Sequence, residues 1–337
     1  MKRLTIIIGL VLISVLAGCS SNPAPFLSTF PPGAPTPTTP VVATSSAPVA
    51  SGTLTWSAPV TIEGAVGVLR SVSCVSSSFC VAVDDQGYAF KYNGTSWSTM
   101  GQIAPKPANY AAVPGLVGVS CPSNNFCMAV SFDGSFLRYD GTSWSSPVRL
   151  PGISPTPSSV SCISASFCVT AGFGAWVYNG TSWSSNMILP EVANKLWNTA
   201  AVSCASINFC LATGGNDVAI YNGKTWSSQS IVTDGELADV SCVNPSYCMA
   251  ADEEQVIQFY NGTSWSAQTS GPTDPEAVSC PSIDFCEAGN SVFMSEYNGT
   301  SWSKPTSVDF AGNFDLSCAS RSFCVVVDDG EAIVGTR

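Results

Sequence analysis

The feature that most constrains the fold of this chain is a pair of cysteines that occurs seven times with one spacing. Five residues separate the two cysteines of each pair, and an aromatic residue always precedes the second cysteine. The pairs are Cys74/Cys80, Cys121/Cys127, Cys162/Cys168, Cys204/Cys210, Cys242/Cys248, Cys280/Cys286 and Cys318/Cys324. Successive first cysteines lie 47, 41, 42, 38, 38 and 38 residues apart. Internal repetition at this period indicates a solenoid, a propeller or another repeat array.

A second motif occurs with the same count. The sequence Tyr-Asn-Gly-Thr-Ser-Trp ends at Trp97, and close variants of it follow each of the next five cysteine pairs. Their tryptophans are Trp144, Trp183, Trp226, Trp265 and Trp302, and a seventh, Trp56, precedes the first pair. Seven of each element over residues 52–337 gives about 41 residues per unit, which is the length of a four-stranded propeller blade.

Local patterns within the first unit predict four strands, which we name A to D in chain order. Strand A covers 72–74, the apolar strand B covers 79–83, the alternating strand C covers 87–92, and strand D begins at Ser96. Asn93-Gly94 is a strong signal for a two-residue hairpin between strands C and D. No segment shows a helical period with caps.

The two ends of the repeat region complete one another. The last cysteine pair is followed by only two further strands, so the seventh unit lacks its strand D. The segment around Trp56 can supply that strand, which closes the ring and removes two open sheet edges. We therefore predict an all-β, seven-bladed propeller of four-stranded antiparallel blades, closed by the N-terminal strand.

The cysteine spacing fits one disulfide across each A–B hairpin, and fifteen cysteines in all point to an oxidising compartment. The alternative is metal ligation or redox chemistry. Zinc ribbons and thioredoxin-like sites use C-x-x-C spacings, however, and the chain contains no histidine. We expect no metal and no cofactor.

The N-terminus predicts an export signal. Lys2 and Arg3 precede a predominantly apolar run of thirteen residues, which is too short to span a bilayer and typical of a signal peptide. The run ends in Leu16-Ala17-Gly18-Cys19, which resembles the bacterial lipobox. That resemblance implies that Cys19 is acylated and holds the protein on the outer side of a bacterial cell membrane, whereas the alternative is ordinary secretion.

Residues 20–51 carry no charge and eight prolines, which predicts an extended tether. The expected organisation is thus a signal peptide at 1–19, a tether at 20–51 and a propeller at 52–337. The repeated Val-Ser-Cys and Tyr-Asn-Gly-Thr-Ser-Trp sequences resemble those of secreted propeller proteins of high-GC Gram-positive bacteria, a group related to WD-like, sialidase-like and Asp-box propellers. Tyr92 and its equivalents stand where an Asp-box has aspartate.

Charge is unevenly placed on the predicted ring. The chain has 23 acidic and 12 basic residues, which disfavours nucleic acid as a partner. Most acids fall in the B–C turns and D–A connections, which share one face of the ring; we call this the acidic face. The A–B hairpins, with their cysteines, and the Asn-Gly turns are expected on the opposite face. The candidate binding residues of the acidic face are Asp84, Asp85, Asp133, Trp197, Asp252, Glu253, Glu254, Asp328 and Asp329. Solvated turns without a ligand are the alternative for each acid.

Catalysis receives little support from the sequence. The absence of histidine removes the Ser-His-Asp and Cys-His systems, and the arginines do not assemble a sialidase-type triad on one face. We predict a non-enzymatic, lipid-anchored monomer that binds a protein, peptide or glycan on its acidic face. The first alternative is a carbohydrate-active hydrolase or lyase that uses two carboxylates of that face. The second is a structural envelope protein that binds no small ligand.

Overall fold

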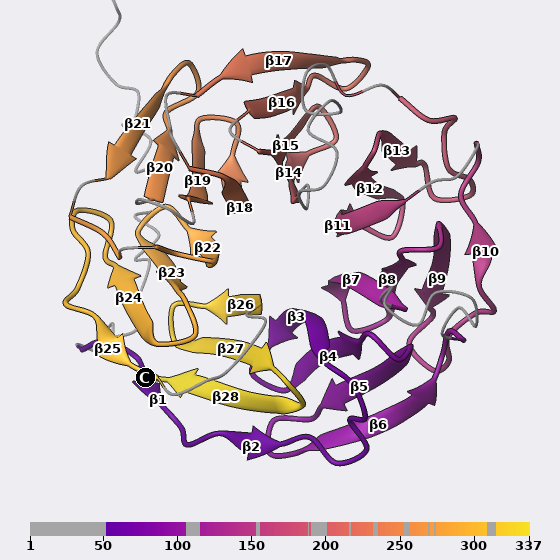
Figure 1. Ribbon diagram of the computed structural model, residues 1–337, viewed down its shortest axis with the longest axis horizontal. Coiled ribbons are helices and arrows are strands. Elements are labelled where there is room, and N and C mark those ends of the chain that lie inside the picture. The colour runs from indigo at the N-terminus through magenta and orange to yellow at the C-terminus, as the bar shows by residue number, and fades with distance from the viewer. Residues whose placement is uncertain are drawn as a thin grey trace, which may run out of the picture. The chain divides into compact units, whose positions relative to one another are not determined.

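A computed structural model describes residues 52–105, 115–152, 156–187, 189, 201–215, 217–231, 235–252, 257–268, 270–272, 274–308 and 315–337. These residues form seven antiparallel sheets arranged as a ring (Figure 1), and the described part of the chain contains no helix. The predicted seven-bladed propeller is therefore confirmed. The acylation site Cys19, the signal peptide and the tether lie outside the described residues.

Each blade runs outward from strand A at the centre to strand D at the circumference. Blades 1 and 2 consist of β3 (Leu69–Ser76), β4 (Phe79–Asp84), β5 (Tyr88–Tyr92) and β6 (Trp97–Gln102), then β7 (Leu116–Ser123), β8 (Phe126–Ser131), β9 (Ser135–Tyr139) and β10 (Val148–Arg149). Blade 3 has β11 (Pro157–Ser164), β12 (Phe167–Gly172) and β13 (Ala175–Tyr178), with isolated bridges to Trp183 and Met187 in the fourth position. Blade 4 has β14 (Val202–Ser206), β15 (Phe209–Gly214), β16 (Asp217–Tyr221) and β17 (Trp226–Ser230).

The remaining three blades follow the same order. Blade 5 has β18 (Leu237–Asn244), β19 (Tyr247–Asp252), β20 (Ile257–Tyr260) and β21 (Trp265–Gln268). Blade 6 has β22 (Ala277–Ser282), β23 (Phe285–Gly289), β24 (Phe293–Tyr297) and β25 (Thr306–Ser307). Blade 7 has β26 (Asp315–Ser320), β27 (Phe323–Asp328) and β28 (Glu331–Thr336), and its outer edge is formed by β1 (Thr55–Trp56) and β2 (Val60–Thr61).

The core consists of layers between adjacent blades. Strand B is covered on both faces, so all six residues of β4, β8 and β27 are buried, and the first five residues of each are apolar without alternation. In one such layer Val81 and Phe79 of blade 1 pack against Leu116 and Leu137 of blade 2. Seven layers of this kind close the ring.

The seven disulfides have the predicted pairing, one in each blade. The second cysteine of each pair lies at the start of strand B, next to the A–B turn. It is 0 % exposed, whereas the first cysteines are half-buried or between 7 % and 9 % exposed. The fully buried second cysteines are Cys80, Cys127, Cys168, Cys210, Cys248, Cys286 and Cys324. They are part of the core between the blades, and none of them can contribute to a binding surface.

A ring of hydrogen bonds joins the innermost strands. In every blade the serine of the Val-Ser-Cys motif accepts a hydrogen bond through Oγ from the backbone N–H of the first cysteine in the next blade, at 2.9 or 3.0 Å. The last of these runs from the Cys74 N–H to Ser317, which joins blade 7 to blade 1. We call this ring the serine belt.

The C–D turn differs from the predicted two-residue hairpin. Tyr92 pairs with Trp97, so four residues form the loop, and the Asn93 side chain closes it by accepting from the Thr95 and Ser96 N–H groups. Gly94 follows with φ of 101°, a left-handed conformation that glycine adopts without strain. The asparagine therefore acts through its side chain, as in an Asx-turn, and not through the backbone of a type I′ turn. The ring of the tyrosine before it packs at a tilt against the tryptophan after it, with ring centroids 5.3 Å apart in blade 1.

Closure of the ring occurs as predicted, because β1 and β2 pair with β28. A buried carboxylate reinforces it. Glu296 of blade 6 accepts from the Leu54 N–H at 3.1 Å and lies 2.5 Å from the Arg337 guanidinium, so one side chain holds both segments that build blade 7. Glu287 lies directly opposite Glu296 on the paired strand and is 2 % exposed. Burial, and then repulsion from Glu296, raises the pKa of Glu287 well above its ordinary value.

Candidate binding face

Three of the predicted binding residues occupy one equivalent position, four residues after the second cysteine of their blade. Asp84, Asp252 and Asp328 end strand B of blades 1, 5 and 7, and each is at most 1 % exposed. The sequence placed them in the B–C turns, both as candidate binding residues and in the alternative of solvated turns, and the structure corrects that placement. They belong to the strands, and they cannot present their charge to a partner on the surface.

The geometry of blade 1 shows what this position does. Asp84 Oδ1 accepts from the N–H groups of Gln86 (3.0 Å) and Tyr88 (2.7 Å), which closes the B–C turn. Asn290 fills the same role in blade 6, where it accepts from Val292 and Phe293. Burial raises the pKa of Asp84, although these backbone hydrogen bonds act in the opposite direction.

The aspartates that follow this position remain accessible. Asp329 is exposed, Asp133 is half-buried, and Asp85 is half-buried beside Arg70, with the charged groups 3.8 Å apart. They belong to blades 7, 2 and 1, so they come from three consecutive blades on one side of the ring. Trp197, Glu253 and Glu254 lie outside the described residues.

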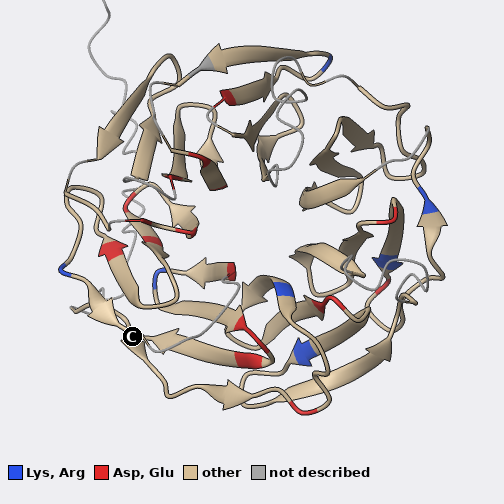
Figure 2. Cartoon of the chain, viewed as in Figure 1, with Lys and Arg blue, Asp and Glu red and all other residues tan. Residues whose placement is uncertain are grey.

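Further acids share the acidic face. Glu63, Glu236 and Asp274 are exposed, while Asp217, Glu276 and Glu331 are half-buried at the starts of strands or in connections. Arg70 and Arg149 are the described basic residues on this face. Figure 2 shows acidic residues along most of the ring, with none in β11, β12 or β13, and few basic ones among them. An excess of accessible carboxylates thus remains after the buried turn-closing aspartates are set aside.

Two other aspartates, also assigned to loops by the sequence, lie instead in strand A. The position three residues before the first cysteine holds Ser71, Ser159, Asp239 and Asp315 in four blades, and each accepts from a backbone N–H of the next blade. Asp239 and Asp315 also accept from the N–H of their own next residue. The preceding blades carry Ala201 and Ala277 at this position, so each aspartate supplies the acceptor that alanine lacks.

The charge state of this pair follows from its surroundings. Burial, and then repulsion from Asp315, raises the pKa of Asp239 to about 7. Burial raises the pKa of Asp315 to about 6, against the effect of its backbone hydrogen bonds. The sequence signal for this arrangement is the occurrence of Ser, Asp or Ala at one repeat position. This signal does not indicate which backbone N–H groups the side chains bind.

The described residues contain no cluster of three or more Cys, Asp or Glu side chains arranged to hold a metal ion. Within the same part of the chain, no helix is long and apolar enough to cross a membrane.

Comparison with known proteins supports the fold alone. No family model and no curated protein sequence matches the chain. Among solved structures, "YCF48 bound to D1 peptide" is similar at 13 % identity and a TM-score of 0.64, covering 84 % of this chain and 97 % of that one. The WD40 propeller domain of Doa1 is similar at 12 % identity and a TM-score of 0.65, covering 84 % of this chain and 97 % of that one. U3-55K is similar at 10 % identity and a TM-score of 0.67, covering 83 % of this chain and 98 % of that one. The chain is thus a seven-bladed propeller with WD40-like structural neighbours.

Proposed function

We propose that this chain is a non-enzymatic binding propeller whose acidic face takes a cationic segment of a protein or peptide. The observation that carries the proposal is the excess of accessible carboxylates in the B–C turns and D–A connections, against Arg70 and Arg149 as the described cations. Such a face attracts basic partners and makes their affinity dependent on salt. A propeller of similar fold, YCF48, is bound to a peptide, which is consistent with a peptide ligand.

Carboxylates with perturbed pKa values are the usual markers of catalysis. Here Asp84 closes a turn, and Asp239 and Asp315 are acceptors between blades. Burial at these positions raises the pKa values, and the carboxylates are engaged in structural hydrogen bonds, so they give the hydrolase alternative no support.

The test uses three exposed acids of the acidic face. We expect the triple variant Glu63→Gln, Glu236→Gln, Asp329→Asn to weaken binding of a deca-lysine peptide at least tenfold at low salt, with unchanged thermal stability. Calorimetric titration at two salt concentrations measures it. The matched control adds three positive charges on the opposite face, with Ser77→Lys, Ala165→Lys and Ile207→Lys in exposed A–B turns. An equal loss of affinity for the peptide in both variants would mean that net charge alone causes the effect, and would contradict specific binding at the acidic face.

We also propose that Cys19 is acylated and anchors the protein on the extracytoplasmic side of the cell membrane. The support is the Leu-Ala-Gly-Cys sequence after a short apolar run. Metabolic labelling with a palmitate analogue should mark the wild-type chain but not Cys19→Ser, and the variant should leave the membrane fraction. Labelling that persists in Cys19→Ser would contradict the anchor.

A further inference from the structure

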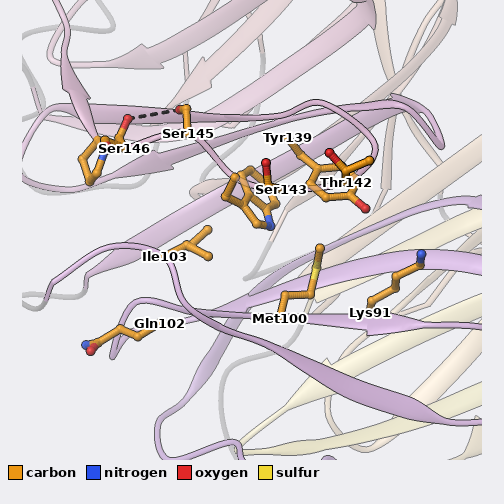
Figure 3. A pocket seen from close by; sticks show the side chains of 11 residues that line it. Lys91, Met100, Gln102, Ile103, Tyr139, Thr142, Ser143, Ser145 and Ser146 are labelled. Atoms are coloured by element: carbon orange, nitrogen blue, oxygen red, sulfur yellow. Dashed lines mark hydrogen bonds between the residues drawn. The ribbon is translucent and has the colours of Figure 1, made fainter.

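A groove lies between the outer strands of blades 1 and 2. Blade 1 contributes Lys91 from β5 and Met100, Gln102 and Ile103 from β6 and its end, and Trp144 lies on the blade 2 side. The cavity volume is about 650 Å³, within the range of sites for small ligands and anchor side chains. Figure 3 shows Met100 at the centre, with Lys91 and Gln102 at opposite ends. We call this cavity the blade 1/2 groove.

A local irregularity places Met100 there. Phe90 pairs with Thr99 and Ala89 pairs with Gly101, so Met100 is an extra residue in β6, a β-bulge. Gly101 adopts a φ of 89°, which favours glycine. Bulges redirect side chains and are frequent beside functional sites. No described atom beyond its chain neighbours lies within 4 Å of a Cβ built on Gly101, so the backbone conformation and not crowding requires glycine.

The equivalent spaces between two other blade pairs are filled. Between blades 2 and 3, Phe136 packs edge-on against Trp183 with ring centroids 5.6 Å apart, and Trp183 is 7 % exposed. Between blades 5 and 6, Gly271 lies against the indole of Trp302, which is 8 % exposed. Trp144 is half-buried and has no such cover from the described residues, so its repeat position is open to a ligand.

The chemistry of the groove differs from that of the acidic face. Lys91 is the one charged residue among the described residues that line it, and its Nζ lies 5.1 Å from the Phe79 ring centroid. The same lining includes no carboxylate, in a chain of net charge −11. A cationic ligand therefore favours the acidic face, and an anionic group favours the Lys91 end of the groove.

The apolar lining distinguishes between classes of ligand. Met100, Ile103 and Pro147 have side chains without a hydrogen-bond donor, so sugar hydroxyls placed against them would lose water without compensation. A large apolar side chain in the same place gains roughly 1.5–3 kcal/mol from burial. The hydroxyls of Ser143 and Ser146 line the rim and can bond to a peptide backbone.

We propose that the blade 1/2 groove binds a polypeptide segment in which a large apolar side chain lies next to a carboxylate. The apolar side chain packs against Trp144, Met100 and Ile103, and the carboxylate pairs with Lys91. This site takes a ligand opposite in charge to that of the acidic face, so the two classes of ligand can be told apart by experiment.

The first test is selection of a phage-displayed random peptide library on the full-length, disulfide-bonded chain. Wild-type protein should enrich peptides with a large apolar residue beside Asp or Glu, as a class separate from Lys- and Arg-rich peptides. Met100→Glu should reduce recovery of the first class at least tenfold and leave the second unchanged. Met100→Leu is the matched control and should retain both. If the apolar-acidic class is absent, or survives Met100→Glu, the groove proposal is overturned whatever happens to the basic class.

The second test assigns the role of Lys91. An enriched peptide and its Glu→Lys counterpart are titrated against wild type, Lys91→Glu and Lys224→Glu, the last being an exposed lysine of blade 4 with the same charge change. Lys91→Glu should weaken binding of the acidic peptide about fivefold and strengthen binding of its Lys counterpart. Lys224→Glu should change neither by more than about 1.5-fold. Equal effects of the two variants, or binding of neutral oligosaccharides with the affinity of the peptides, would refute the assignment.

Discussion

The innermost strands are more alike from blade to blade than the outermost strands. The serine belt is identical in all seven blades. The outer edge has two forms. β6, β17 and β21 each pair with strand C as one strand, with a bulge at Met100 in β6. In blades 2, 3, 6 and 7 the outer strand is interrupted after a Trp-Ser pair. In the interrupted form a serine hydroxyl accepts from strand C, as Ser145 does from the Arg138 N–H. The inner ring thus fixes the architecture, and the outer edge is free to vary and to create sites such as the blade 1/2 groove.

The largest effect should come from removing the closing strands. Deleting residues 53–61 removes β1 and β2, the buried Leu54, and the Trp56 ring that lies against Gly335. Loss of Leu54 alone is comparable to a Leu→Ala change, so we expect the free energy of unfolding to fall by more than about 4 kcal/mol. Urea denaturation of the oxidised protein measures it. The exposed Val60→Ser is the control, and a deletion variant as stable as Val60→Ser would show that the outer edge contributes nothing to closure.

A second effect concerns pH and the strand A aspartates. The pKa values of Asp239 and Asp315 are about 7 and about 6 in the folded protein, and that of Glu287 is well above its ordinary value. The folded state therefore holds more protons than the unfolded state from about pH 4 to 7, so stability is lost as pH rises through this window. We expect the free energy of unfolding to be about 3 kcal/mol lower at pH 8 than at pH 5. A flat or rising profile would contradict the assignment.

A matched variant sharpens this prediction. In Ala201→Ser/Asp239→Ser the two hydroxyls can replace the two carboxylate acceptors, as Ser71 and Ser159 do in other blades. In the double variant, the free energy of unfolding should decrease much less between pH 5 and pH 8 than it does in the wild type. Asp274→Asn, an exposed change, should retain the wild-type profile.

The smallest effect compares two serines of blade 2. Ser120→Ala removes the belt acceptor of the Cys162 N–H, in a part-buried hydrogen bond, whereas Ser145→Ala removes that of the Arg138 N–H at an exposed edge, where water can replace it. We expect the free energy of unfolding to fall by about 1–2 kcal/mol in Ser120→Ala and by under about 0.5 kcal/mol in Ser145→Ala. Chemical denaturation of both variants measures the difference. Equal losses of unfolding free energy in the two variants would contradict the proposed difference between the serine belt and the outer edge.

Much of the fold could be predicted because its signals are local and periodic. Cys74/Cys80 and its six equivalents fix the unit, the apolar run at 79–83 marks the strand covered on both faces, and the early Trp56 supplies the missing strand. The C–D turn was predicted with the wrong length because Asn-Gly is read first as a backbone turn. The Thr-Ser that follows was the signal for closure by the Asn93 side chain.

The site could not be predicted to the same degree because burial depends on contacts between blades. Asp84 and Asp85 are adjacent in sequence, yet one closes a turn in the interior and the other reaches solvent. Glu296 meets Leu54 and Arg337 only after the ring has closed, at a sequence separation of 242 residues in the first case. Met100 enters its groove through a bulge that no hydrophobic period indicates.

The Glu296 contacts also determine how the ring responds to mechanical load. Tension on the segment before residue 52 reaches the ring first at the Leu54 N–H, which Glu296 holds, and then at the short pairing of Thr55 and Trp56 with β28. Because Glu296 also holds Arg337 at the end of β28, blade 6 supports both partners of that pairing from the side. A pull on the N-terminal segment is therefore shared between two blades before any pair of strands must separate.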